Sequence, residues 1–253
     1  NLKLDCIFNA IHGTPGEDGK MQKYFEDKNI PITGCDSNKS KLTFDKINCL
    51  NFLSSKGIKV ASSISLLKSE KIDVNEIENK IGFPCFIKAS NSGSSFGVYK
   101  VHNKKEMIRC INSALQVDNK VLIESFIDGR EFSIGVISFK RSIKVLPVTE
   151  IITSNDFFDY EAKYEGKAEE ITPANITDEL KYKLKLLSKK IYNLLGLKGF
   201  SRSEFIVNDN GIYYLETNTV PGLTSESILP KQAHCADISL KELFINAINE
   251  AII

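Results

Sequence analysis

Strand-like and helix-like segments alternate along this chain of 253 residues, and the alternation predicts an α/β or α+β fold. Short runs of β-branched and apolar residues, bounded by turn residues, indicate the strands. Longer runs with apolar residues every three or four positions indicate amphipathic helices between them. A chain of this length has room for two or three compact units, and it can bury a core without disulfides or metals.

The N-terminal part supplies the first expected elements. We expect a buried strand over residues 2–10, a glycine- and proline-rich loop over 12–19 and a helix over 21–27. Turn residues fill 30–38 and mark the first candidate domain boundary. A longer helix is expected over 41–56. The apolar residues on its expected buried face are Leu42, Ile47, Leu50 and Leu53.

The middle of the chain contains four strand-like runs and one helix-like run. The strands are expected over residues 85–89, 98–101, 121–123 and 131–137. The helix is expected over 104–115, between the second and third of these strands.

The clearest helix is expected over residues 177–195. Thr177 can cap its first turn, Asp178 and Glu179 suit its positive end, and Gly196 can end it. The apolar stripe of this helix is formed by Leu180, Leu184, Leu187, Ile191 and Leu194.

Composition and charge narrow the class of function. The formal net charge is +1, so bulk charge favours neither a nucleic-acid nor a membrane partner. The sequence has no apolar run near the roughly 20 residues that span a bilayer, and no signal-peptide pattern, so we expect a cytoplasmic protein. The six cysteines lack C-x-x-C pairs and zinc-type spacing, so reduced and mostly buried thiols are expected.

A carboxylate-bearing hairpin is the first candidate for chemistry. Two β-rich runs, 203–207 and 212–216, flank the turn sequence Asn-Asp-Asn-Gly at 208–211. Side chains two apart on a strand share a face, so Arg202 and Glu204 share one face, and Glu216 and Asn218 share one face if the strand extends that far. The two pairs face each other only if the loop has an odd number of residues. We therefore predict a three-residue loop over 209–211, with Gly211 at positive φ.

Two converging carboxylates and an amide oxygen form a hard oxygen site, which suits Mg²⁺. An arginine beside that site can stabilise developing negative charge. The alternative from these residues alone is a solvated charged hairpin.

Two loops are further candidates. Lys88 ends an apolar strand, and the small-residue loop 89–97 follows it; such a loop can lay N–H groups and hydroxyls against phosphate oxygens. It lacks the P-loop pattern, and a flexible surface loop is the alternative. Aromatic and charged residues alternate over 157–166, as in a functional lid, with a packed surface loop as the alternative.

Several motifs, in the same order along the chain, together resemble the D-alanine–D-alanine ligases of the ATP-grasp superfamily, from about Leu4 to the C-terminus. They are HGTPGEDG, the lysine-led NSGSSFGV, VLIESF with GREFSIGV, FFDYEAKY, and SRSEF with LETNTVPGLTSESILP. The resemblance implies an ATP-grasp fold, in which two α+β subdomains hold the nucleotide. Residues 1–36 would be the remnant of an N-terminal α/β domain, 37–123 the central subdomain and 124–253 the C-terminal catalytic subdomain.

The resemblance also implies which residues bind ATP. Lys46 and Lys88 would contact the phosphates, residues 124–127 would form the adenine hinge, and Glu131 would bind the ribose. The complete implied set is Lys46, Lys88, Ser95, Glu124, Ser125, Phe126, Ile127, Glu131 and Lys163.

The remaining implied roles concern metal and substrates. Two Mg²⁺ ions, or Mn²⁺ in their place, would be held by Glu204, Glu216 and Asn218; glutamate stands at 204 where many of these ligases have aspartate. Substrates would be bound by Glu17, Ser227 and Ile228, with Glu17 at the first amino acid and the others at the carboxylate of the second. The implied catalytic residues are Arg202, Ser94, Tyr164, His12 and the Gly222 backbone.

The implied reaction forms D-alanyl-D-alanine for peptidoglycan. The first D-alanine takes the γ-phosphate of ATP as an acyl phosphate, and the amine of the second displaces phosphate. A homodimer is implied as well. A ligase that joins other amino acids or small carboxylates, and a non-catalytic nucleotide-binding module, remain the alternatives.

Overall fold

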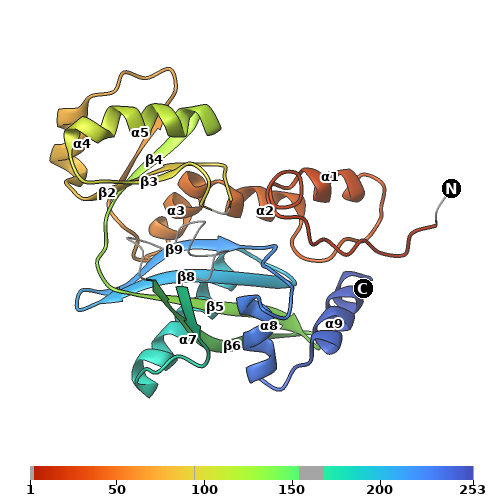
Figure 1. Ribbon diagram of the computed structural model, residues 1–253. Coiled ribbons are helices and arrows are strands. Elements are labelled where there is room, and N and C mark those ends of the chain that lie inside the picture. Colours follow the sequence, from red (N-terminus) through yellow and green to blue (C-terminus); the bar gives the residue numbers. More distant parts are fainter. Residues whose placement is uncertain (1–2, 94, 154–167, 253) are drawn as a thin grey trace.

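The computed structural model describes residues 3–93, 95–153 and 168–252, and its fold consists of two antiparallel sheets flanked by helices (Figure 1). The four-stranded sheet has the order β1-β4-β2-β3, and the five-stranded sheet has the order β7-β6-β5-β8-β9. All pairings between named strands are antiparallel, so the class is α+β. The strands are β1 Ser63–Leu67, β2 Cys85–Ala89, β3 Val98–Val101, β4 Lys120–Ser125, β5 Arg130–Phe139, β6 Ser142–Thr153, β7 Ala168–Ile171, β8 Phe200–Asn208 and β9 Gly211–Asn218.

The helices divide between two lobes. The four-stranded lobe comprises β1–β4 with α4 and α5, and the five-stranded lobe comprises β5–β9 with α7, α8 and α9 (Figure 1). The helices are α1 Lys20–Glu26, α2 Ser37–Phe44, α3 Lys46–Ser55, α4 Val74–Ile81, α5 Lys104–Val117, α7 Asp178–Leu194, α8 Ile228–Cys235 and α9 Leu240–Ile252. Within the described residues, no helix is both long enough and apolar enough to cross a membrane.

Strand alternation explains how each sheet offers one apolar and one polar face. In β2, Cys85 and Ile87 enter the core with α4 and α5, so Phe86 and Lys88 face the opposite way. In β5, Phe132 and Ile134 enter the core with α3 and α7, and Glu131 faces away from that core. The two faces opposite these cores line the cleft between the sheets.

Helices α8 and α9 cover the far end of that same face of the five-stranded sheet. Leu229 of α8 and Leu243 of α9 pack in one core with Ile137 of β5 and Phe200 of β8. The charged end of the sheet is therefore left for the cleft, because the other end is filled by apolar side chains.

Several predicted elements are confirmed. Helices α1, α5 and α7 and strands β2, β3, β4 and β5 lie where the sequence placed them. Thr177 accepts a hydrogen bond from the Leu180 N–H at 3.3 Å, and Gly196 has φ +62° just beyond α7. The prediction that the six cysteines are free and mostly buried is also confirmed, since only Cys235 is exposed.

Two predicted elements are wrong. Residues 3–10 do not form a buried strand: only Ile7 finds a partner, in a single parallel bridge to Ile32. The helix expected over 41–56 is two helices. Asp45 has extended backbone, with φ −82° and ψ 98°, and its side chain accepts from the Asn48 N–H and so caps a new helix, α3.

The domain division stays a prediction. Leu50 and Leu53 of α3 pack in the core of the five-stranded lobe, together with Phe205 of β8. The segment after α3 touches the same lobe, because the Tyr214 N–H donates to the Lys59 carbonyl at 2.8 Å. We propose 37–123 as a central subdomain whose first helices pack on its neighbour.

Candidate active site

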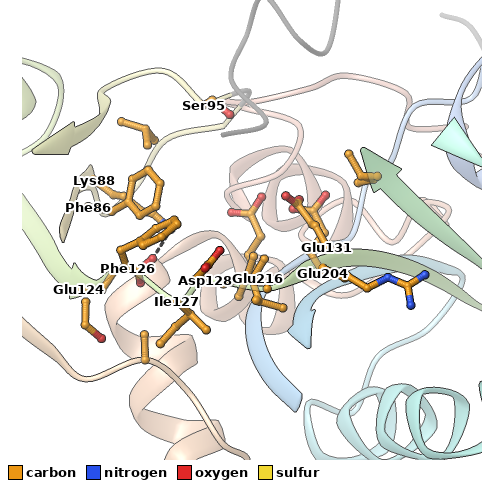
Figure 2. Close-up of a pocket in the computed structure, with 18 of the residues that line it drawn as sticks. Phe86, Lys88, Ser95, Glu124, Phe126, Ile127, Asp128, Glu131, Glu204 and Glu216 are labelled. Carbon is orange, nitrogen blue, oxygen red and sulfur yellow. Dashed lines mark ion pairs between the residues drawn. The ribbon is translucent and has the colours of Figure 1, made fainter. Parts of the chain in front are cut away.

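The main functional candidate is a cavity of about 480 Å³ between the two sheets (Figure 2). Its walls are partly apolar, with Phe86 and Val98 from the four-stranded lobe and Ile206 and Leu215 from the five-stranded lobe. The link from β4 to β5, residues 126–129, runs along it, so the chain crosses between lobes at the cavity. Of the residues expected to bind ATP, Lys46, Lys88, Ser95, Glu124, Ser125, Phe126, Ile127 and Glu131 all line this cavity.

A buried ion pair lies in the four-stranded wall. Lys88 of β2 pairs with Glu124 of β4, and both side chains are largely buried (Figure 2). Burial by itself lowers the pKa of Lys88, but the charge and hydrogen bond of Glu124 outweigh it, so the pKa of Lys88 is raised. Lys88 therefore stays cationic in a partly apolar cleft, where it can attract a phosphate oxygen.

The predicted carboxylate pair is present in the opposite wall. Glu204 and Glu216 are direct partners in the β8–β9 ladder, and Arg202 is the partner of Asn218. Figure 2 shows Glu204, Glu216 and Glu131 pointing into the same cavity. Arg202 pairs with Glu204, and its Nη1 also donates to the Ser133 hydroxyl at 3.0 Å.

The predicted loop of this hairpin is wrong, although the pairing is confirmed. Asn208 pairs with Gly211, so the loop has two residues rather than three. A β-bulge between Tyr214 and Glu216 then inserts Leu215 and restores the register that an odd loop would have given. Gly211 does have positive φ, +127°, as predicted.

The bulge also brings Leu215 into the cleft, which strict alternation would not do. Leu215 lines the same cavity as its neighbour Glu216. It is a site residue that the sequence analysis missed, because a bulge residue has no compositional signature. Phe86, Val98 and Ile206 were missed for a simpler reason: as apolar strand residues they resemble core.

The oxygen donors fit a hard divalent cation. Glu204 and Glu216 converge from adjacent strands, and Asn218 adds an amide oxygen, which here accepts from the Val220 N–H at 2.7 Å. Among the described residues, no group of three or more His, Cys, Asp or Glu side chains forms a metal site alone. A cation bound here would thus need oxygens from phosphate or water, as Mg²⁺ commonly does.

A second cavity, of about 420 Å³, adjoins the first. Lys46, Gly93 and Glu216 line both, so they mark the junction of the two cavities. Besides Lys46 and Glu216, the predicted residues that line the second cavity are His12, Glu17, Arg202, Asn218, Gly222 and Ser227.

His12 and Glu17 form a polar pair in the second cavity. The His12 Nδ1 and Glu17 Oε1 atoms lie 3.4 Å apart, with Glu17 buried and His12 about half exposed. The hydrogen bond to Glu17 raises the pKa of His12, against the opposing effect of burial. An imidazole beside a carboxylate can hold or pass a proton near neutral pH.

Lys46 connects the junction to the glycine–serine loop. Its Nζ donates to the Ser92 carbonyl at 2.6 Å and lies 3.5 Å from Glu216 Oε2. Its backbone N–H donates to the Ser90 carbonyl at 3.1 Å. Gly93 follows on this loop, and a Cβ there would come within 3.2 Å of Glu17 Oε2.

Gly222 packs against the start of α8. A Cβ on Gly222 would lie 2.5 Å from the Ser227 hydroxyl oxygen, so a larger residue would displace Ser227. Ile228 is the first residue of α8 and is buried; it is not part of the lining that the described residues form. Ser94, Lys163 and Tyr164 lie outside the described residues, so the predicted lids stay predictions.

Comparison with known proteins identifies the family. The sequence family described as "D-ala D-ala ligase C-terminus" matches residues 52–249. D-Alanine–D-alanine ligases from Flavobacterium johnsoniae and Christiangramia forsetii are 56% and 49% identical over 98% and 99% of this chain, which spans 76% and 77% of theirs.

Solved structures agree in fold over almost the whole chain. The VanG D-Ala:D-Ser ligase from Enterococcus faecalis superposes with a TM-score of 0.90 at 35% identity, covering 100% of this chain and 74% of that protein. The D-alanine–D-alanine ligase of Bacillus anthracis complexed with ATP superposes with a TM-score of 0.85 at 30% identity, covering 98% of this chain and 79% of that protein. With its cleft between two α+β lobes, this chain belongs to the D-alanine–D-alanine ligase family and has the ATP-grasp fold.

Proposed function

We propose that this protein joins two D-alanine molecules with ATP, through an acyl phosphate, and so supplies D-alanyl-D-alanine for peptidoglycan. One observation carries the proposal. A nucleotide-sized cleft opens into a second, polar cavity, and Lys46 and Glu216 belong to the lining of both. Phosphoryl transfer to a carboxylate needs this adjacency, because the attacking oxygen must reach the γ-phosphate in line.

We assign nucleotide binding to residues of the first cavity, metal binding to residues of both cavities and amino-acid binding to residues of the second. Lys46 and Lys88 bind phosphate oxygens, and residues 124–127 hold the adenine. Glu204, Glu216 and Asn218 would hold the Mg²⁺, which when bound would neutralise phosphate charge. Arg202 and the Gly222 N–H stabilise negative charge that develops when the second amine attacks. Ser227 and the N-terminus of α8 receive a carboxylate, which suits the positive end of a helix.

The proposed acceptor is a second D-alanine, and D-serine is the competing acceptor. Relatives at 56% and 49% identity bear the name D-alanine–D-alanine ligase. The VanG ligase, with the name D-Ala:D-Ser ligase, superposes at a TM-score of 0.90 but shares only 35% identity. The higher identity favours D-alanine.

The test is amino-acid-dependent ADP release, with the product identified by mass spectrometry. The expected result is that D-alanine, added without any other amino acid, stimulates ADP release and gives D-alanyl-D-alanine as product. A mixed product made only when D-serine is added would favour the competing acceptor. ATP binding without turnover under any amino acid would favour a non-catalytic module and overturn the proposal.

Four further properties belong to the same proposal. We propose two Mg²⁺ ions, replaceable by Mn²⁺, because the donor set contains only oxygen. A homodimer and a cytoplasmic location are proposed from the resemblance to the ligase family and from the supply of ATP. Omission of Mg²⁺ tests the metal requirement, replacement by Mn²⁺ tests the exchange, and sedimentation of the full-length protein tests the homodimer.

A further inference from the structure

Gln232 is a fully buried amide on α8 that binds both β5 and β6. Its Oε1 accepts from the Gly135 N–H at 2.9 Å, and its Nε2 donates to the Ser133 carbonyl at 2.8 Å. The same Nε2 donates to the Thr149 hydroxyl at 2.9 Å. The backbone partners fix the orientation of the amide, because an N–H only donates and a carbonyl only accepts.

Ser133 connects this amide to the catalytic arginine. Its carbonyl accepts from Gln232, while its hydroxyl accepts from Arg202 Nη1 at 3.0 Å. Ser133 is fully buried and is the ladder partner of Glu204, which itself pairs with Arg202. One buried serine therefore contacts both the arginine and α8.

The strand geometry at this point accommodates the amide. The β5–β6 ladder changes register between Ile134 and Val136, beside Pro147, which has no N–H to donate. Gly135 lies at this irregularity, and a Cβ there would come within 2.6 Å of Gln232 Oε1. The absence of a side chain at 135 thus lets α8 approach the strand closely enough for Gln232 to bind it.

The other end of the connection is the start of α8. Helix α8 begins at Ile228, and Ser227 at its N-cap lines the second cavity, so Gln232 lies just over one turn into the helix. Because the first turn of α8 is a regular helix, the position of Gln232 fixes the position of the helix N-terminus. The separation between that N-terminus and Arg202 is accordingly set through Gln232 and Ser133.

We propose that Gln232 and Ser133 are positioning residues that set the second-amino-acid subsite relative to Arg202. The inference rests on the proposed function, in which the α8 N-terminus holds the carboxylate of the attacking amino acid. Its amine must meet the acyl carbon whose developing charge Arg202 stabilises. A shift of about 1 Å between two such groups can cost on the order of 100-fold in rate.

The chain offers a matched control on the neighbouring helix. Asn246 of α9 is a buried amide that binds the end of β5 and the turn after it: its Nδ2 donates to the Ser138 carbonyl at 2.7 Å, and its Oδ1 accepts from the Lys140 N–H at 2.8 Å. It lies outside both cavities as the described residues line them. Gln232→Leu and Asn246→Leu remove the same chemistry from α8 and α9.

The experiment compares KM for the second amino acid, KM for ATP, kcat and Tm in the full-length protein. For Gln232→Leu we expect KM for the second amino acid to rise roughly tenfold or more and kcat to fall, with KM for ATP within about twofold. Asn246→Leu should lower Tm without changing the ratio of the two KM values. Ser133→Ala should lower kcat, and Ser133→Thr, which keeps the hydroxyl, should restore much of it.

Two results would overturn the inference. One is an unchanged KM ratio in Gln232→Leu, and the other is an equal change in Asn246→Leu. The proposed function is tested separately, by the amino-acid dependence of ADP release in the wild-type protein. If another amino acid rather than D-alanine stimulates that release, the same KM comparison is made with that amino acid.

Discussion

At the scale of single residues, each cation of the site is held beside a carboxylate. Lys88 pairs with Glu124, Arg202 with Glu204, and Lys46 lies 3.5 Å from Glu216. A buried charge without a partner is costly, so the carboxylate partners of Lys88 and Arg202 stabilise the cleft before a nucleotide enters. Phosphate and a divalent cation can then replace the internal partners, because they bring the opposite charges to the same atoms.

Glu216→Gln should remove turnover and leave the fold intact. The substitution keeps the shape of the side chain but removes a charged ligand, so kcat should fall by on the order of 100-fold or more. The Glu216 side chain is 37% exposed, so Tm should change little. Glu226→Gln, at a side chain 85% exposed, is the control. An unchanged kcat would remove Glu216 from the proposed metal site.

The His12–Glu17 pair predicts a pH dependence. The contact with Glu17 raises the pKa of His12 in the folded protein, so the contact stabilises the fold below the ordinary histidine pKa of about 6.5. That stabilisation is lost as the pH rises through the raised pKa. NMR titration of His12 should give a lower pKa in Glu17→Gln than in the wild type. Equal values would show that Glu17 does not hold the proton on His12.

At the scale of elements, the hairpin shows how a correct pairing followed from a wrong loop. Without a bulge, Glu204 and Glu216 can oppose each other only if the number of residues between the paired strands is odd. We predicted that the extra residue lies in the turn. The structure places it in the strand, at Leu215, and the turn has two residues. A bulge depends on the partner strand and on what packs beneath it, and here Tyr214 is fully buried beside it. Neither is visible in a single sequence.

Other elements show the same division between local and long-range determinants. Helix α7 was predictable because its cap, Thr177, and its apolar stripe are local. The break at Asp45 was local as well, and the aspartate was the available signal for it. Residues 3–10 are different: a strand requires a partner, and apolar composition does not show whether one exists. Strands β1, β6 and β7 are present but were not predicted.

Leu215→Ala tests the role that the bulge gives to this side chain. If Leu215 contacts the nucleotide, its truncation should weaken ATP binding by about 1–2 kcal/mol, which corresponds to roughly 5- to 30-fold in Kd. KM for D-alanine should stay within about twofold. Leu186→Ala, at a leucine 55% exposed on α7, is the matched control. Equal ATP affinity in the two variants would mean that Leu215 is only a strand residue.

At the scale of the whole molecule, the two lobes share more than the link at residues 126–129. Helix α3 packs in the core of the five-stranded lobe, and its first residue, Lys46, reaches both the loop carbonyl of Ser92 and Glu216. Tyr214 of β9 binds the Lys59 carbonyl just after α3. A ligand that binds across the cleft therefore stabilises contacts that belong to both cores.

The cysteines provide a measurement of that global coupling. Burial raises the pKa of Cys35 to about 12 and of Cys49 and Cys85 to about 11, so at pH 8 these thiols are protonated as well as inaccessible. Cys235 is exposed, and we expect a disulfide reagent to modify it rapidly, whereas the buried thiols should react only through unfolding.

ATP with Mg²⁺ at about 100 times its Kd should raise the free energy of global unfolding by about 2.7 kcal/mol. This corresponds to roughly 100-fold slower labelling of Cys35, Cys49 and Cys85. The rate at Cys235 should not change, which makes that thiol the internal control. Mass-spectrometric peptide mapping during labelling gives all four rates at once. If ATP protected only Cys49, which packs against Tyr214 beside the cleft, the stabilisation would be local and the two cores would open independently.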